Sequence, residues 1–373
     1  MRYRRFGKTH LHLSVFSLGT MRFLASEEIA VNTVWQAVSR GVNHLETAKG
    51  YGKSEEYLGA AISCGLPISR DRLHITTKIP PTSNPATIER SIDDSLQRLK
   101  LDYLDCLAIH GINTWEHLEW VHNLMPTINA ALADGRVRHI GFSTHGALDL
   151  IIAAINTDYF EFVNIHYYYF FQRNLPAIEL AWAKDMGIFI ISPADKGGQL
   201  YNPPEELKNL CLPLSPLALN YRFLLSDPRI TTLSFGPANV KELDLPLEFS
   251  DRDDSLTSAE IAIFERLENQ AKISLATDKC SQCYACLPCP ENINIPEILR
   301  LRNLAVAYNM TDFGKYRYRM FENAGHWFPG VKGNRCTDCG ECLPRCPENL
   351  DIPALLKDTH LRLSTVSGRR LWN

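Results

Sequence analysis

The cysteines of this 373-residue chain are unevenly distributed, and their placement constrains the fold more than any other feature. Eight of the eleven lie between residues 280 and 346, in two runs that each hold four cysteines and end in Cys-Pro. The other three stand alone and are expected to be small buried apolar residues: Cys64, Cys106 and Cys211. The chain therefore divides into a cysteine-poor body and a cysteine-rich tail.

The two runs belong to a duplicated unit. The first reads Cys280-x2-Cys283-x2-Cys286-x2-Cys289, and the second reads Cys336-x2-Cys339-x2-Cys342-x3-Cys346. The similarity continues past the cysteines, with PENINIPEIL after the first run and PENLDIPALL after the second, at an offset of about 57 residues. Repetition of this kind indicates two copies of one structural element.

The spacing of the cysteines is typical of ligands to cubane iron–sulfur clusters. The second run matches the C-x2-C-x2-C-x3-C-P motif of bacterial ferredoxins, and the first run is one residue shorter before its last cysteine. A tight C-x2-C-x2-C loop can bind three irons of a cluster, so we expect the fourth thiolate to come from the other run. The sequence therefore predicts two [4Fe–4S] clusters with crossed ligand sets: Cys280, Cys283, Cys286 and Cys346 for one, and Cys336, Cys339, Cys342 and Cys289 for the other.

Zinc and disulfides are the alternatives for these cysteines. Zinc sites usually use two separated C-x2-C pairs, or cysteine together with histidine. Neither run contains a histidine. Disulfides are uncommon in a reducing compartment.

The segment around the runs is expected to be helical. Apolar residues from Ile295 to Tyr308 recur at helical spacing, and Pro296 and Pro353 suit the first turn of a helix. Residues 273–373 are thus predicted to form a small, mostly helical ferredoxin-like domain.

The body, residues 1–272, alternates short apolar runs with longer amphipathic stretches. Strands are expected at Val15–Leu18, Val42–Glu46, Leu73–Thr77, Tyr103–Ile109, His139–Ser143, Phe162–His166, Ile188–Ser192 and Thr231–Ser234. Helices are expected at Ile29–Arg40, Ser54–Ser63, Pro85–Leu99, His117–Asp134, Ala147–Ile155, Pro176–Met186 and Leu217–Leu225. Eight such units favour an α/β fold of the (β/α)8 TIM-barrel type. A doubly wound sheet is the alternative, although no G-x-G-x-x-G follows the first strand.

Charge and hydropathy exclude some classes of function. A net charge of −3 argues against a dedicated nucleic-acid-binding protein. The N-terminus lacks the apolar run of a signal peptide, and no stretch approaches 18 apolar residues. We therefore expect a cytoplasmic protein with no membrane or nucleic-acid partner.

Polar residues gather at the expected carboxyl ends of the strands, where barrel enzymes carry their chemistry. Glu46 ends the second strand and Tyr51 follows it closely, while Lys78 and His110 end the third and fourth strands. An acid, a phenol, an amine and an imidazole are thus expected on one rim.

The body resembles the aldo/keto reductase family. The resemblance rests on LETAKGYGKSEEYLG, on TTK, LAIH and GFST at strand ends, and on the late LSFGPANVKEL, and it covers nearly all of residues 1–270. The family's tetrad of Asp, Tyr, Lys and His corresponds to Glu46, Tyr51, Lys78 and His110, with Glu46 one methylene longer than the usual Asp. With its tail, the chain is similar to the iron–sulfur subset of this family.

The resemblance implies reduction of an aldehyde or ketone by hydride transfer. The developing alkoxide needs a proton donor, and a free Tyr, with a pKa of about 10, holds its proton too tightly at neutral pH. We expect the Lys78 ammonium to lower the pKa of Tyr51, the proton donor. Glu46 would fix Lys78, and His110 would orient the substrate carbonyl.

The resemblance also implies NADP(H), bound without a Gly-rich phosphate loop. By this resemblance, Ser143 and Asn164 would hold the nicotinamide amide, and Tyr167 would stack on the nicotinamide ring. Ser192 would lie at the pyrophosphate, and Gly236 and Asn239 would lie at the adenosine phosphate. Lys241, two residues past Asn239, favours NADPH over NADH.

Two functional hypotheses follow. The first is an NADP(H)-dependent reductase of small carbonyl compounds whose two clusters transfer electrons. Nicotinamide moves two electrons as hydride whereas a cluster moves one, and no flavin motif is evident. The second is therefore an iron–sulfur electron-transfer or redox-partner docking protein whose barrel has weak or altered reductase activity. A purely structural role of the clusters is a further alternative. The basic and aromatic segment 315–319 would suit an acidic redox partner such as a ferredoxin, or would form a solvated helix face.

Overall fold

The computed structural model describes residues 1–364 of the chain, which fall into two compact units. The first unit comprises Met1–Gly197 and Asn220–Ser255. The second comprises Gly198–Leu219 and the chain from Leu256 onward. The domain limits expected from the sequence, 1–272 and 273–373, stay a prediction.

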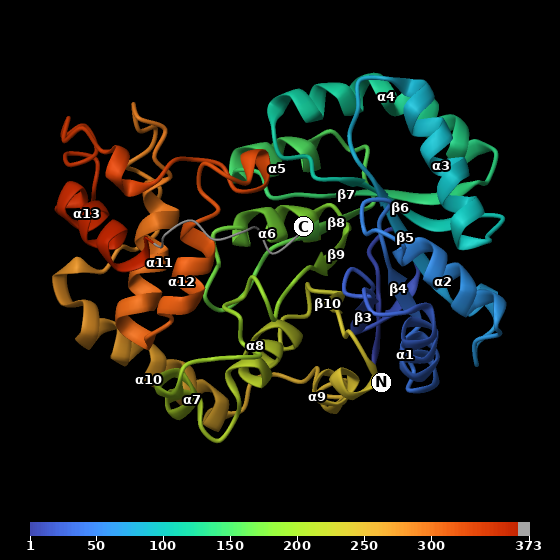
Figure 1. Ribbon diagram of the computed structural model, residues 1–373, viewed down its shortest axis with the longest axis horizontal. Coiled ribbons are helices and arrows are strands. Elements are labelled where there is room, and N and C mark those ends of the chain that lie inside the picture. The colour runs from blue at the N-terminus through green and yellow to red at the C-terminus, as the bar shows by residue number, and fades with distance from the viewer. Residues whose placement is uncertain (365–373) are drawn as a thin grey trace. The chain divides into compact units, whose positions relative to one another are not determined.

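The first unit is built around a closed barrel of eight parallel strands (Figure 1). The strands are β3 (Phe16–Gly19), β4 (His44–Glu46), β5 (His74–Ile79), β6 (Leu104–His110), β7 (Val137–Ser143), β8 (Phe162–Ile165), β9 (Gly187–Ile190) and β10 (Thr232–Phe235). They follow one another around the barrel in chain order, and β10 closes it against β3. The predicted (β/α)8 barrel is confirmed, and the eight expected strands are all present.

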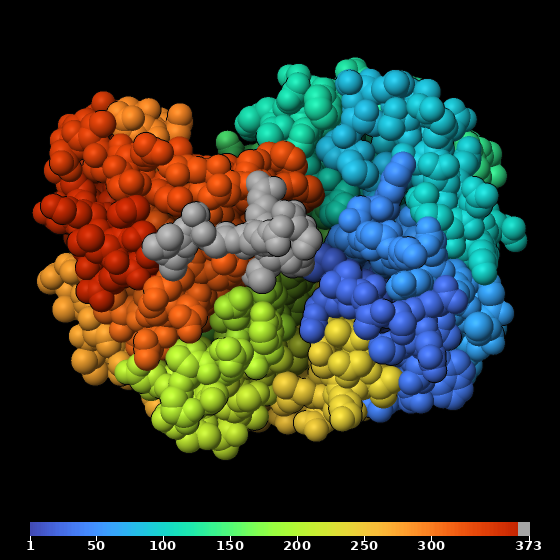
Figure 2. All heavy atoms as spheres, in the orientation of Figure 1, coloured from blue at the N-terminus to red at the C-terminus, as the bar shows by residue number. Residues whose placement is uncertain are grey.

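The helices of this unit are α1 (Glu27–Ser39), α2 (Ser54–Ser63), α3 (Pro85–Leu99), α4 (Trp115–Ala133), α5 (Leu148–Asn156), α6 (Leu175–Ala183), the part of α8 (Pro216–Leu225) that begins at Asn220, and α9 (Asp244–Glu248). In the space-filling view, the blue to teal atoms of residues from α1 to α4 form a continuous part of the visible surface (Figure 2). Local signals explain α3, where the Asn84 side chain caps the helix and Pro85 occupies its first turn. Ile88, Ile92 and Leu99 then recur at helical spacing and are buried.

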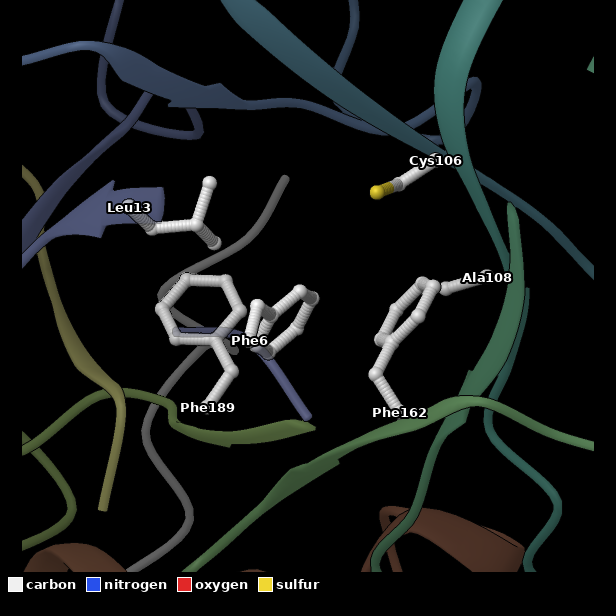
Figure 3. Packing of buried hydrophobic residues seen from close by; sticks show 6 residues of the cluster. All are labelled: Phe6, Leu13, Cys106, Ala108, Phe162 and Phe189. Carbon is white, nitrogen blue, oxygen red and sulfur yellow. The ribbon is translucent and has the colours of Figure 1, made fainter. Parts of the chain in front are cut away.

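A short hairpin closes the amino-terminal end of the barrel. Strands β1 (Tyr3–Arg5) and β2 (His12–Ser14) pair antiparallel. They bring Phe6 and Leu13 into a buried cluster with Phe162 and Phe189 from the barrel (Figure 3). A Cβ at Gly187 would lie 2.3 Å from the Phe6 ring, so glycine lets the hairpin approach. Strands of three residues give no periodic signal, and the sequence does not predict this hairpin.

The second unit is mostly helical, as expected. Its helices are α7 (Glu205–Cys211), α10 (Ser258–Leu275), α11 (Ile295–Tyr308), α12 (Thr311–Tyr318) and α13 (Ile352–Leu363). The two cysteine runs are irregular segments that precede α11 and α13. The expected helix at Ile295–Tyr308 is confirmed, and Pro296 and Pro353 lie in the first turns of α11 and α13.

Two expectations about burial are wrong. Cys64 is exposed just after α2, whereas Cys106 and Cys211 are buried as expected. The segment 315–319 is not a solvated helix face, because Arg317 and Tyr318 are buried. The Arg317 guanidinium lies 4.2 Å from the centre of the Phe328 ring, and Tyr318 bonds to His360. The sequence pattern of basic and aromatic residues could not reveal that residues distant along the chain pack against Arg317 and Tyr318.

Within residues 1–364, none of the helices combines the length and apolar character that a bilayer crossing requires.

Candidate active site and cluster sites

The four expected tetrad residues lie at the carboxyl ends of three adjacent strands. Glu46 ends β4, Lys78 lies near the end of β5, and His110 ends β6. Tyr51 lies in the loop between β4 and α2. These residues meet at one end of the barrel because parallel strands place all their carboxyl ends there.

Hydrogen bonds hold the loop that carries Tyr51. The Thr47 N–H donates to Thr76 at 2.8 Å, and the Tyr51 N–H donates to Ala48 at 3.0 Å. The Ser54 N–H donates to the Tyr51 carbonyl at 3.0 Å, and the Ser54 hydroxyl bonds to that of Thr47 at 2.8 Å. The loop is therefore tied both to β5 and to the start of α2.

Lys78 is the centre of the site. Its side chain is buried, and its ammonium contacts the carboxylate of Glu46, which is buried as well. The ammonium also donates to the carbonyl of Thr47 at 3.1 Å and to the hydroxyl of Tyr51 at 3.2 Å. The longer acid at position 46 thus still forms the ion pair, and one ammonium links the carboxylate to the phenol.

Burial is the main cause of the pKa shifts of Tyr51 and Lys78. Desolvation raises the pKa of the Tyr51 hydroxyl above its ordinary value. Burial, together with the positive charge of Lys196, lowers the pKa of the Lys78 ammonium, and the contact with Glu46 opposes this. The expected lowering of the Tyr51 pKa is therefore wrong for the protein alone, because desolvation outweighs the nearby ammonium. The phenol is in its protonated, donating form.

His110 is a neutral imidazole. Burial, with the positive charges of Lys78 and Lys196, lowers its pKa to about 3. Its ring meets the Tyr51 ring edge-on, with centroids 5.6 Å apart and planes at 85°. A neutral imidazole keeps one N–H donor, which is what orientation of a carbonyl oxygen requires.

Two of the expected cofactor residues are neighbours in the barrel. Ser143 and Asn164 are register partners on β7 and β8. The Ser143 hydroxyl accepts from the Gly111 N–H at 3.0 Å. Both amide atoms of Asn164 are buried and have no hydrogen-bond partner among residues 1–364. Leaving a buried donor and a buried acceptor without partners costs free energy of folding. The amide N–H and carbonyl oxygen of Asn164 are complementary to a carboxamide, so the site fits a nicotinamide.

The other expected cofactor residues lie apart from this pair. Tyr167 is buried, with its ring 5.5 Å from that of Phe223 on α8. Ser192 has a positive φ of 55° just after β9. Stacking by Tyr167 and a pyrophosphate site at Ser192 stay predictions.

The segment expected to bind the adenosine phosphate lies beside both an acidic and a basic side chain. The Gly236 carbonyl accepts from Arg22 at 3.0 Å, and Arg22 pairs with Glu242 at 2.6 Å. Asn239 caps a 3-10 helix (Val240–Leu243), with its side chain accepting from the Lys241 N–H at 3.0 Å. The role of this segment in binding a phosphate stays a prediction.

The cysteines surround two cavities in the second unit. One cavity is lined by Cys280, Cys283, Cys286 and Cys346, and the other by Cys336, Cys339, Cys342 and Cys289. Each run thus contributes three cysteines to one cavity and its last cysteine to the other. These are the two groupings expected for crossed cubanes, and the four thiols of each cavity fit the ligand set of a [4Fe–4S] cluster.

The thiols have no other covalent partner. All eleven cysteines lie within residues 1–364, and none forms a disulfide. Among the same residues, no three His, Cys, Asp or Glu side chains are gathered as ligands of one metal ion. The thiolates of a cubane each bind a different iron, so they need not lie as close together.

Comparison with known families decides the class of the protein. The model of the aldo/keto reductase family matches residues 16–202, half of the chain. The chain belongs to the aldo/keto reductase family. The model of a 4Fe-4S dicluster domain matches residues 279–350. Family membership implies NAD(P)H for this aldo/keto reductase, and the dicluster domain with its eight cysteines implies [4Fe–4S] clusters.

Several known proteins are similar to this aldo/keto reductase. Methylglyoxal reductase DkgB of Escherichia coli O157:H7 is 30% identical over 184 residues, 48% of this chain and 66% of DkgB. An uncharacterized oxidoreductase of Bacillus subtilis, YrpG, is 23% identical over 294 residues, 65% of this chain and 89% of YrpG. The solved structure of the holo form of aldo-keto reductase AKR11C1 from Bacillus halodurans superposes with a TM-score of 0.63 at 21% identity, covering 71% of this chain and 96% of that one.

This aldo/keto reductase also places a second polar group near the tetrad. The Lys196 ammonium lies 3.3 Å from His145 Nε2, and the same His145 ring is 3.3 Å from His166 Nε2. His166 bonds in turn to the Tyr168 hydroxyl at 2.5 Å. The position of His145 just after β7 could have suggested its place at the rim. No motif marks Lys196, which the loop after β9 brings close enough to influence the pKa of Lys78.

Proposed function

We propose that this protein reduces a small aldehyde or ketone with NADPH, using Tyr51 as the proton donor. The observation that carries the proposal is the position of Lys78, whose ammonium contacts Glu46 and lies 3.2 Å from the Tyr51 hydroxyl. These groups form a connected acid–amine–phenol array at the mouth of the barrel.

The residues act on the carbonyl oxygen of the substrate. When bound, the reduced nicotinamide supplies a hydride to the carbonyl carbon. Tyr51 donates its proton to the oxygen as negative charge develops there. The Lys78 ammonium stabilises the tyrosinate left behind, and Glu46 holds Lys78 in position. The neutral His110 donates a hydrogen bond to the same oxygen and orients it.

Asn164 and Ser143 would hold the carboxamide of the nicotinamide. The amide of Asn164, which has no partner within the described residues, supports this because it offers a donor and an acceptor to a group of the same kind. At the other end of the cofactor, Lys241 is the cation proposed to favour NADPH over NADH. Tyr167, Ser192, Gly236 and Asn239 complete the proposed cofactor contacts.

The two cysteine cavities would hold the clusters with the crossed ligand sets given above. When bound, each cluster supplies one-electron transfer. An alternative role is structural, and the crossing favours it, because each cluster would bind residues of both runs and so contribute folding energy. In that case the cysteine-rich region acts mainly in docking a partner, and the reductase activity of the barrel is weak or altered.

Steady-state oxidation of NADPH tests the proposal. Methylglyoxal is a reasonable first substrate, since the relative DkgB is a methylglyoxal reductase. We expect activity in the wild type and a loss of about 100-fold or more in Tyr51→Phe, the range of general acid catalysis. Equal rates in both proteins would contradict the role of Tyr51. Activity that survives bleaching of the clusters would favour the structural role, and loss in parallel with the clusters would favour electron transfer.

A further inference from the structure

The two cysteine cavities are close copies in their exposure to solvent. The first cysteine of each run is partly buried, the second is exposed, the third is buried, and the fourth is partly buried. Solvent exposure is one of the factors that set the reduction potential of a cluster. These classes match, although Cys280 and Cys286 lie deeper in the protein than Cys336 and Cys342. The order of the two potentials therefore rests on contacts to the sulfurs that outweigh this burial.

The backbone environment of the sulfurs matches as well. A backbone N–H at Gln282 faces the Cys280 sulfur, and one at Asp338 faces the Cys336 sulfur. Both residues follow the first cysteine of their run by two positions, and both have positive φ, 63° and 55°. The duplicated loops therefore present the same backbone donors.

The side chains at this shared position differ. The Gln282 amide nitrogen donates to the Cys280 sulfur at 3.5 Å and to the Pro296 carbonyl at 2.8 Å. The second bond holds the amide with its donor toward the sulfur. A hydrogen bond to sulfur stabilises the additional negative charge of a reduced cluster and raises its potential.

Asp338 presents the opposite chemistry. Its carboxylate lies 3.8 Å from the Cys336 sulfur, where it accepts from the thiol. A cysteine bound to iron is a thiolate and has no proton to share. The carboxylate then adds only negative charge beside the sulfur, which opposes reduction.

Other nearby charges do not reverse this difference. The repeat places one glutamate at each cavity, Glu348 at the first and Glu291 at the second. The second run carries three charged residues without a charged counterpart in the first: Asp338, Glu341 and Arg345. Arg345 also lines the second cavity, but its guanidinium donates to the carbonyls of Glu341 and Pro288, whereas the Asp338 carboxylate contacts the Cys336 sulfur directly.

We infer that the cluster held by Cys280, Cys283, Cys286 and Cys346 has the higher reduction potential, and that Gln282 and Asp338 set the order. The inference rests on the proposed two-cluster function. Each cluster accepts one electron from a one-electron donor, passing from the 2+ to the 1+ state without breaking a bond. The first electron therefore resides on the cluster beside Gln282.

An anaerobic redox titration of the full chain with dithionite tests this, with the reduced clusters followed by electron paramagnetic resonance. Gln282→Met removes the donor at similar size, and it should lower the higher of the two midpoint potentials. Asp338→Asn removes the charge at the same size, and it should raise the lower midpoint. We expect at least a tenfold change in the ratio of reduced to oxidised cluster at a fixed potential, about 59 mV for one electron.

Glu341→Gln is the matched control, because it removes an exposed charge of the second run whose carboxylate forms no hydrogen bond with a cysteine within residues 1–364. It should shift the lower midpoint less than Asp338→Asn does. A shift of the lower midpoint by Gln282→Met, or no shift by either variant, would overturn the inference. If Gln282→Met does not retain its cluster, the upward shift in Asp338→Asn decides alone. A wild-type iron count near four would instead overturn the two-cluster assignment itself.

Discussion

The ammonium of Lys78 lies 3.2 Å from the hydroxyl of Tyr51, to which it donates a hydrogen bond. Both groups are desolvated, and desolvation raises the pKa of one while it lowers the pKa of the other. Neither group alone suits proton transfer at neutral pH. Together they form a unit in which loss of the phenol proton is compensated by the adjacent cation.

Because they act as a unit, the effects of removing Tyr51 and Lys78 should not add. Tyr51→Phe and Lys78→Met are each expected to lower kcat by about 100-fold or more. The double variant should be no more than about threefold slower than the slower single variant. Steady-state kinetics on the three proteins measure this, and a multiplicative loss in the double variant would show that the two residues act independently.

The buried ion pair should matter for stability. Glu46→Gln leaves the ammonium of Lys78 buried without its anion, which costs about 3 kcal/mol of the free energy of unfolding. Urea denaturation measures this, and adding Lys78→Met should recover part of the loss. The exposed pair Arg40–Asp244 is the control, since Asp244→Asn should cost less than about 1 kcal/mol. Equal losses in the two cases would contradict the role assigned to burial.

The crossing of the ligand sets predicts which cysteine changes act on one cluster. Cys346→Ser combined with Cys283→Ser should disturb a single cluster and leave about four irons per chain. Cys346→Ser combined with Cys339→Ser should disturb both. Iron and sulfide analysis after anaerobic purification distinguishes the two pairs, and Cys211→Ser is the control that should retain all the iron. The reverse order of the two pairs would show that each run binds its own cluster.

Asn164 should act on cofactor affinity more than on folding. Its amide is buried, and the part of the chain that the structure describes offers it no hydrogen-bond partner. Asn164→Ala should weaken NADPH binding by about tenfold or more, because hydrogen bonds lost on a buried polar ligand cost about 1–3 kcal/mol. Fluorescence titration measures the Kd, and urea denaturation without cofactor should show little loss. Unchanged affinity would place the carboxamide elsewhere.

Because His44 is buried, we expect the free energy of unfolding to fall toward acid pH. Burial, with smaller contributions from His74 and Lys78 against Asp105, lowers its pKa to about 3. Between the ordinary pKa near 6.5 and this value, the unfolded chain binds a proton that the folded chain does not. The free energy of unfolding should therefore fall as pH decreases through this window, by up to about 1.4 kcal/mol per pH unit from this residue.

Urea denaturation from pH 7.5 to 5.5 measures that slope. His44→Gln should flatten it, whereas His12→Gln, at an exposed position, should leave it unchanged. If His44→Gln keeps the wild-type slope, the pH dependence comes from other groups, such as His110.

Much of the architecture could be predicted because its signals are local. Caps and apolar spacing mark α3, and the helix Ile295–Tyr308 is marked by Pro296 and a buried apolar pattern. The grouping of the cysteines around two cavities also agrees with the expectation from spacing, since a tight loop can present only three thiols to one cluster. The hairpin around Phe6 could not be predicted, because its strands are too short to show a period.

By itself, the sequence determined the alternation of strands and helices, the duplication of the cysteine runs and the residue types at the strand ends. Only the tertiary structure decided which atoms meet: Lys78 with Tyr51 and Glu46, Lys196 with His145, and Gln282 with the Cys280 sulfur. The tertiary structure likewise decided that desolvation would raise the pKa of Tyr51. The physical reason is that periodicity and spacing are carried by neighbours along the chain, whereas burial and electrostatics depend on segments that only folding brings together.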